Sequence, residues 1–143
     1  IVKLHPGQDL HNDDIKTLFK EIDSTIPVYQ LKPIANLLAK CNILVNISPE
    51  GFDPSTVILE SLIMNKPTMN IILDENFFDF QYVKDNAVVS LSDQSDLEKN
   101  LHEILFNDNF RDKLSQNGRN FLATYLINPG NASESFAKIL TSY

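Results

Sequence analysis

The feature that most constrains this chain is a regular alternation of short apolar runs with segments of helical periodicity. Each run has the length of a β-strand, and the segment after it repeats its apolar residues every three or four positions. Such an alternation is typical of βα units, in which helices cover a mostly parallel sheet. The near-continuous apolar run Ile43–Ile47 suits a strand that is buried on both faces.

The alternation predicts where each element lies. Strands are expected at Ile1–Leu4, Pro27–Leu31, Asn42–Ser48, Thr68–Leu73 and Ala87–Leu91. Helices are expected at His11–Ile22, Pro33–Cys41, Pro54–Met64, Ser95–Phe106, Asn109–Leu126 and Ala132–Ser142, and the aromatic-rich segment Asn76–Lys84 fits either class. The sequence therefore predicts an α/β fold, with a Rossmann-like, mostly parallel sheet of about five strands, flanking helices and a helical C-terminal tail.

Composition narrows the class of protein. The length of 143 residues suits one domain, so residues 1–143 are expected to form a single domain. The formal net charge of −7 gives no general attraction to a phosphate backbone, and a nucleic-acid partner is not expected. No apolar run is long enough to span a membrane. The single cysteine, Cys41, excludes a disulfide within the chain and favours a reducing, cytoplasmic location.

The best candidate for a binding site is the segment that joins the third expected strand to the next helix. In an open parallel sheet, ligands bind beyond the carboxyl ends of the strands, and a helix that begins there offers free N–H groups to a phosphate. The hydroxyls of Ser55 and Thr56 would add donors. Glu60 lies one turn deeper on the same helix face as Thr56, where its carboxylate can accept hydrogen bonds from a ribose diol.

His5 directly follows the first expected strand, where a histidine can donate to a phosphate or act as an acid or base. Plainer interpretations stay open, because Ser and Thr begin many helices that bind nothing and a lone Glu or His is commonly solvated. The sequence contains no glycine-rich phosphate loop, no nucleophile-elbow pattern and no paired spacing of metal ligands.

The segment Ser48–Pro67 resembles the donor-site segment of GT-B glycosyltransferases of polysaccharide and glycan biosynthesis. It has a Glu-Gly-Phe loop, then a helix that holds a second Glu, then a Lys-Pro turn into an apolar strand. The Lys-Leu-His-Pro sequence at Lys3–Pro6 and the tail around Gly118–Leu122 are also similar to that family. The resemblance covers nearly the whole chain and implies the C-terminal, nucleotide-sugar-binding domain of a larger enzyme.

The resemblance implies that a set of residues binds the donor, and these are His5, Leu31, Lys32, Glu50, Gly51, Ser55, Thr56 and Glu60. Glu60 would bind the ribose, and Ser55 and Thr56 would hold the diphosphate. Glu50 and Gly51 would lie near the transferred sugar. By the same resemblance, Leu31 and Lys32 would border the base pocket through backbone groups, and His5 would face the phosphates or the sugar.

The resemblance also implies what lies outside these residues. The family uses a nucleotide sugar as substrate without a further cofactor or a bound metal, and its acceptor site lies on an N-terminal domain of the same protein. It has one more strand before the position of Ile1, in the centre of the sheet. We therefore expect the chain alone to transfer no sugar, and no catalytic residue is assigned.

Two other classes of protein stay open. The chain also resembles one half of a nucleotide-sugar 2-epimerase, which has the same fold. A non-catalytic sugar-nucleotide-binding or regulatory module would show the same sequence pattern. A response-regulator receiver is disfavoured, because it needs an acidic pair after its first strand and an Asp at the end of its third. In this chain the first expected strand ends at Leu4 and is followed by His5, and Ser48 ends the third.

Overall fold

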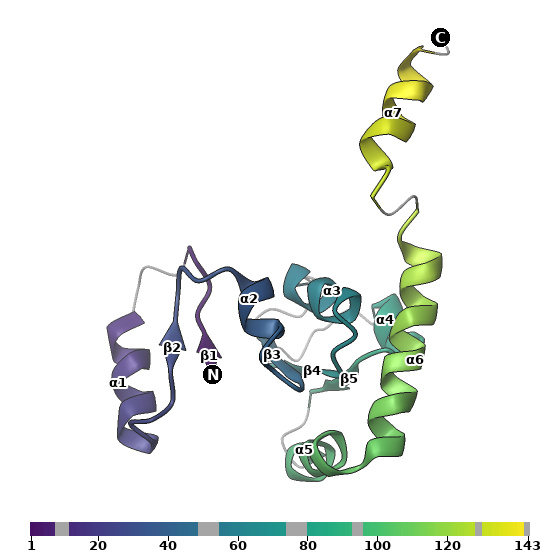
Figure 1. Cartoon of the computed structure of the whole chain (residues 1–143). Helices are drawn as coiled ribbons and strands as arrows, with labels where there is room; N and C mark the ends of the chain where they lie inside the picture. The colour runs from purple at the N-terminus through teal and green to yellow at the C-terminus, as the bar shows by residue number, and fades with distance from the viewer. Residues whose placement is uncertain (8–11, 49–54, 74–79, 93–95, 128–129, 142–143) are drawn as a thin grey trace. The chain divides into compact units, whose positions relative to one another are not determined.

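The chain is an α/β protein in the computed structural model, which describes residues 1–7, 12–48, 55–73, 80–92, 96–127 and 130–141 (Figure 1). It divides into two compact units, Ile1–Cys41 and Asn42–Tyr143, each of which is described by itself. Whether the two units make up one domain stays a prediction.

Strands and helices alternate along the described residues, as the sequence predicts. The strands are β1 (Val2–Lys3), β2 (Val28–Tyr29), β3 (Leu44–Ser48), β4 (Thr68–Ile72) and β5 (Val89–Leu91). The helices are α1 (Asn12–Ile22), α2 (Ile34–Leu38), α3 (Thr56–Ile63), α4 (Gln81–Lys84), α5 (Leu97–Phe106), α6 (Asp108–Tyr125) and α7 (Ala132–Thr141).

The first unit is built on a short parallel pair of strands, β1 and β2, joined through α1. Val2 pairs with Val28 and Lys3 with Tyr29. The N–H of Leu4 extends this ladder by donating to the carbonyl of Tyr29 at 2.8 Å. Helix α2 is shorter than the predicted Pro33–Cys41, because the N–H groups of Lys40 and Cys41 bond three residues back and tighten the turn that follows it.

The second unit contains a parallel sheet with the strand order β3-β4-β5. Leu44 to Ser48 pair with Thr68 to Ile72, and Met69 to Ile71 pair with Val89 to Leu91. All pairings among the described residues are parallel, as predicted, but the five strands form two sheets of two and three strands instead of one. The two sheets belong to different units, since β1 and β2 lie in Ile1–Cys41 and β3, β4 and β5 in Asn42–Tyr143.

The position of β3 at the edge also corrects the prediction that it is buried on both faces. Val45 and Ile47 are 39% and 61% exposed, whereas the opposite face carries the half-buried Asn46 and the buried Ser48. Edge strands are covered by one neighbour only, so an apolar run in the sequence does not guarantee burial.

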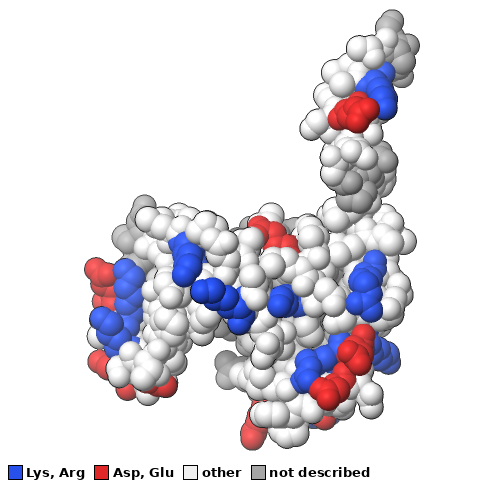
Figure 2. All heavy atoms as spheres, in the orientation of Figure 1, with Lys and Arg blue, Asp and Glu red and all other residues white. Residues whose placement is uncertain are grey.

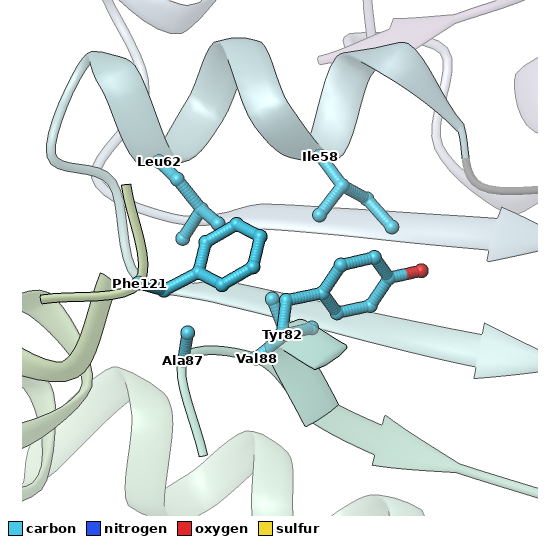
Figure 3. Close-up of a cluster of buried hydrophobic side chains, with 6 residues drawn as sticks. All are labelled: Ile58, Leu62, Tyr82, Ala87, Val88 and Phe121. Atoms are coloured by element: carbon cyan, nitrogen blue, oxygen red, sulfur yellow. The ribbon is translucent and has the colours of Figure 1, made fainter. Parts of the chain in front are cut away.

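Helices cover both faces of this sheet and create two apolar clusters. On one face, the cluster lies where α3 and α6 pack against the sheet, and it consists of Ile58, Leu62, Tyr82, Ala87, Val88 and Phe121 (Figure 3). On the other face, α5 and the first half of α6 enclose Met69, Leu91, Ile104 and Leu114. Each cluster combines residues that are far apart in sequence, so the sheet of the second unit has an apolar core on each face.

Helix α6 approaches α3 closely at one glycine. A Cβ atom at Gly118 would lie 3.1 Å from Cδ2 of Leu62, so a larger side chain there would push the helices apart. The start of α6 is fixed by Asn107, whose side chain accepts a hydrogen bond from the N–H of Phe110 at 3.1 Å.

Helix α7 has no buried residue, and its apolar side chains Phe136, Ile139 and Leu140 are exposed. Within the described ranges, no helix combines the length and the apolar character that crossing a bilayer requires.

Truncation of Phe121 tests the apolar layer beneath α3. Phe121 is 2% exposed and its ring lies edge-on to that of Tyr82, with 6.2 Å between centroids. We expect Phe121→Ala to lower the free energy of unfolding by about 3–5 kcal/mol in urea denaturation, because it leaves a cavity. Phe106→Ala, at a position that is 71% exposed, is the control and should cost less than about 1 kcal/mol. Equal losses in the two variants would contradict the observed core.

Candidate functional site

The strongest candidate site is the start of α3, which follows β3 at the carboxyl edge of the sheet. Ser55 occupies the N-cap position, but its side chain makes no capping hydrogen bond. The first N–H groups of an α-helix have no acceptor within the helix. Among the described residues, the N–H of Ile58 is the first in the helix to find a backbone acceptor, the carbonyl of Ser55 at 3.0 Å. The hydroxyl of Ser55 does not cap the helix, which is consistent with its predicted role as a donor to a ligand.

Glu60 lies in the second turn of α3 and is half-buried. Its carbonyl accepts a hydrogen bond from Met64, but its carboxylate makes no hydrogen bond or ion pair with a described residue. A partly buried carboxylate without a partner retains its full capacity to accept hydrogen bonds from a ligand. Thr56, one turn earlier, is exposed.

A polar network that the sequence analysis did not single out lies on the sheet face beneath α3. The side-chain amide of Asn46 donates to the Ser48 hydroxyl at 2.9 Å and to Oδ1 of Asn70 at 2.7 Å. Ser48 in turn donates to the same oxygen at 3.0 Å. The network fixes the last residue of β3, from which the chain leads toward α3. Its sequence signal was polar residues at alternate positions of apolar strands.

A second buried polar group that the sequence analysis missed is the hydroxyl of Tyr82. Tyr82 is 4% exposed within the apolar layer of Figure 3, and its hydroxyl has no hydrogen-bond partner among the described residues. Burial raises the pKa of Tyr82 to about 12, because the phenolate would be poorly solvated there. No pattern in the surrounding aromatic-rich segment distinguished this tyrosine from a plain core residue.

In the first unit, the parallel pair β1–β2 brings His5 and Leu31 to one edge, since each lies two residues beyond the Lys3–Tyr29 pair. Nδ1 of His5 accepts a hydrogen bond from the N–H of Gly7 at 3.2 Å, so Nε2 carries the proton of the neutral ring. Leu31 is 83% exposed, and Nζ of Lys32 lies 4.4 Å from the ring centroid of Tyr29.

The predicted donor-binding residues thus fall into three groups. His5, Leu31 and Lys32 belong to the first unit, and Ser55, Thr56 and Glu60 to the second. The predicted Glu50 and Gly51 lie outside the described residues. Among the described residues, no group of His, Cys, Asp and Glu side chains could hold a metal ion.

The surface shows no single basic patch on the face drawn in Figure 2, where acidic and basic side chains are interspersed. Fold and site together define an α/β protein with Rossmann-like parallel strands and a candidate anion site at a helix N-terminus. Comparison of the chain with protein-family models, with curated proteins and with solved structures gives no match.

Replacement of Asn70 tests the polar network. Asn70→Ala removes the oxygen that both Asn46 and Ser48 contact, and unsatisfied buried polar groups are costly. We expect the free energy of unfolding, measured with urea, to fall by about 1–3 kcal/mol. Ser90→Ala is the matched control, because Ser90 pairs with Asn70 on the neighbouring strand but is only half-buried. A loss in the control as large as that in Asn70→Ala would argue against a specific network.

The raised pKa of Tyr82 makes stability depend on pH in the alkaline range. Its pKa of about 12 in the folded chain exceeds the unfolded value, which is about 10. The preference of the fold for the neutral tyrosine is therefore fully present below about pH 10. The free energy of unfolding then falls as the pH rises toward 12, because the unfolded chain releases the proton more readily. Relative to Tyr82→Phe, we expect the unfolding free energy of the wild type to fall by about 1.5 kcal/mol between pH 10 and 11.5. Parallel curves for the two proteins would contradict this expectation.

Proposed function

We propose that this chain is the nucleotide-sugar-binding domain of a glycosyltransferase, with the donor diphosphate at the start of α3. The observation that carries the proposal is the N-terminus of α3, the next described element after β3, where the side chain of Ser55 makes no capping hydrogen bond. One turn deeper, the carboxylate of Glu60 has no partner among the described residues. Donors for phosphate and an acceptor for a diol are thus arranged along one short helix.

The N-terminus of α3 is suited to bind an anionic ligand for two reasons. Aligned peptide dipoles place a partial positive charge there, and the free N–H groups point outward as donors. In a chain with a net charge of −7, this local effect is what favours a phosphate. Ser55 is half-buried and Thr56 exposed, so both hydroxyls lie close to the surface at which a ligand would arrive.

Glu60 is suited to bind the nucleoside part of the ligand. Its carboxylate accepts hydrogen bonds only, and a ribose diol offers two adjacent O–H donors, which a carboxylate can bind in a bidentate manner. The half-buried position of Glu60 reduces competition from water. A phosphate at the same place would be repelled, so the helix separates the two ends of the ligand along its axis.

The remaining predicted residues complete the proposal. His5 would donate through Nε2, Leu31 and Lys32 would border the base, and Glu50 and Gly51 would contact the sugar. The ammonium of Lys32 is attracted by the ring of Tyr29, which leaves the backbone of this segment as its means of contacting a base. The acceptor would bind to another domain of a cytoplasmic enzyme of polysaccharide or glycan biosynthesis, and these aspects of the proposal remain predictions.

Nucleotide binding by the chain tests the proposal. UDP, GDP, CDP, ADP and their common sugar conjugates are titrated while the amide chemical shifts are followed by NMR. We expect one base to shift the amides of Ser55–Glu60. Glu60→Gln, which removes the charge but keeps the shape, should weaken that binding by about tenfold, as expected for a hydrogen bond to a charged group.

Glu98→Gln provides the matched control, because Glu98 is an exposed acidic residue in the first turn of α5. It should bind as the wild type does. No binding of any nucleotide at millimolar concentration would refute the proposal for this chain and leave a structural or regulatory role. Interconversion of sugar epimers by the full-length protein without an acceptor would favour the epimerase.

A further inference from the structure

The buried hydroxyl of Tyr82 makes no hydrogen bond with the described residues. Of the buried side-chain nitrogen and oxygen atoms in the described parts of the chain, it is the one without a hydrogen-bond partner. Its ring is held between two others, stacked on Phe80 at 5.3 Å and edge-on to Phe121 at 6.2 Å between centroids. Because a flip of the ring leaves the hydroxyl oxygen in place, the side chain cannot turn to find another acceptor.

The direction of this hydroxyl connects it to the start of α3. In Figure 3, the ring lies below Ile58, and its oxygen points to the side on which α3 begins and the arrowheads of the strands lie. Ile58 belongs to the first turn of α3. The hydroxyl and the free N–H groups of α3 thus face the same end of the second unit, one from the apolar layer and the others from the helix.

The chemistry of the hydroxyl makes it a donor. A tyrosine hydroxyl is protonated at neutral pH, and burial raises the pKa of Tyr82 further, to about 12. A donor withheld from both water and protein acceptors is unfavourable, and an anionic oxygen relieves this cost more than a neutral one does. Buried polar groups that lack a partner are uncommon in native proteins, and a ligand is one of the reasons for them.

We propose that the hydroxyl of Tyr82 donates a hydrogen bond to a phosphate oxygen of the ligand held at the start of α3. Tyr82 is then a binding residue for a nucleoside diphosphate, supplied by the aromatic layer beneath the helix. This inference rests on the proposed function and extends it, because it assigns a neutral donor that neither the helix dipole nor the hydroxyls of Ser55 and Thr56 provide.

The substitution Tyr82→Phe tests the inference, since it removes one oxygen and preserves the ring. Affinity for inorganic pyrophosphate and for UDP, GDP, CDP and ADP is measured from amide chemical shifts, and the midpoint of thermal unfolding is measured on the same samples. We expect binding about tenfold weaker than in the wild type, as for a hydrogen bond to a charged group. The unfolding midpoint should be equal or higher, because an unpartnered buried hydroxyl has been removed.

Tyr125→Phe is the matched control. Tyr125 stacks on Phe121 at 4.9 Å but is 55% exposed, so the same change there should leave affinity unaltered. If the wild type binds and Tyr82→Phe binds within twofold of it, the inference is overturned and the proposed function stands. A lower unfolding midpoint in Tyr82→Phe would show a structural role and overturn it as well. Absence of binding by the wild type would overturn both.

Discussion

The structure of the second unit depends on the close packing of α3 between the sheet and α6. At the sheet, the hydroxyls of Ser61 and Thr68 lie 2.6 Å apart, and both are fully buried. At α6, Gly118 leaves just enough room for Leu62. These contacts hold the C-terminal half of α3, and its N-terminus begins on the side of the sheet where β3 ends. The packing of the helix therefore determines where its dipole and its open N–H groups are offered.

Two of the polar exceptions to the apolar layer beneath α3, Asn70 and Tyr82, show what the fold does with buried hydrogen-bonding groups. Asn70 is 2% exposed and accepts from both Asn46 and Ser48, so its oxygen is satisfied within the sheet. Tyr82 is equally well buried, but its hydroxyl is not satisfied. The first exception has a structural explanation in the position of Ser48, whereas the second has none within the described residues.

The sequence predicted the elements well where the signals are local. The helix expected at Pro54–Met64 is observed at Thr56–Ile63, because its proline start and its apolar spacing are properties of neighbouring residues. The division into two sheets and the exposure of Ile47 were not predicted, since strand pairing joins residues that are distant in sequence. The same holds for the contact of Asn46 with Asn70, which requires the register of β3 against β4. For Tyr82, only packing shows that the hydroxyl lacks a partner.

A helix terminus by itself is a weak binding site, because an exposed charge gains only about 0.3–1 kcal/mol from the dipole. Specific binding of a phosphorylated ligand requires further groups that are fixed in place and shielded from water. Along α3 these groups occur at two depths: the hydroxyls of Ser55 and Thr56 at the surface, and the carboxylate of Glu60 one turn below. The hydroxyl of Tyr82 would add a donor from beneath. Because its ring is clamped by Phe80 and Phe121, this donor would be oriented before any ligand arrives, and binding would cost little of its conformational entropy.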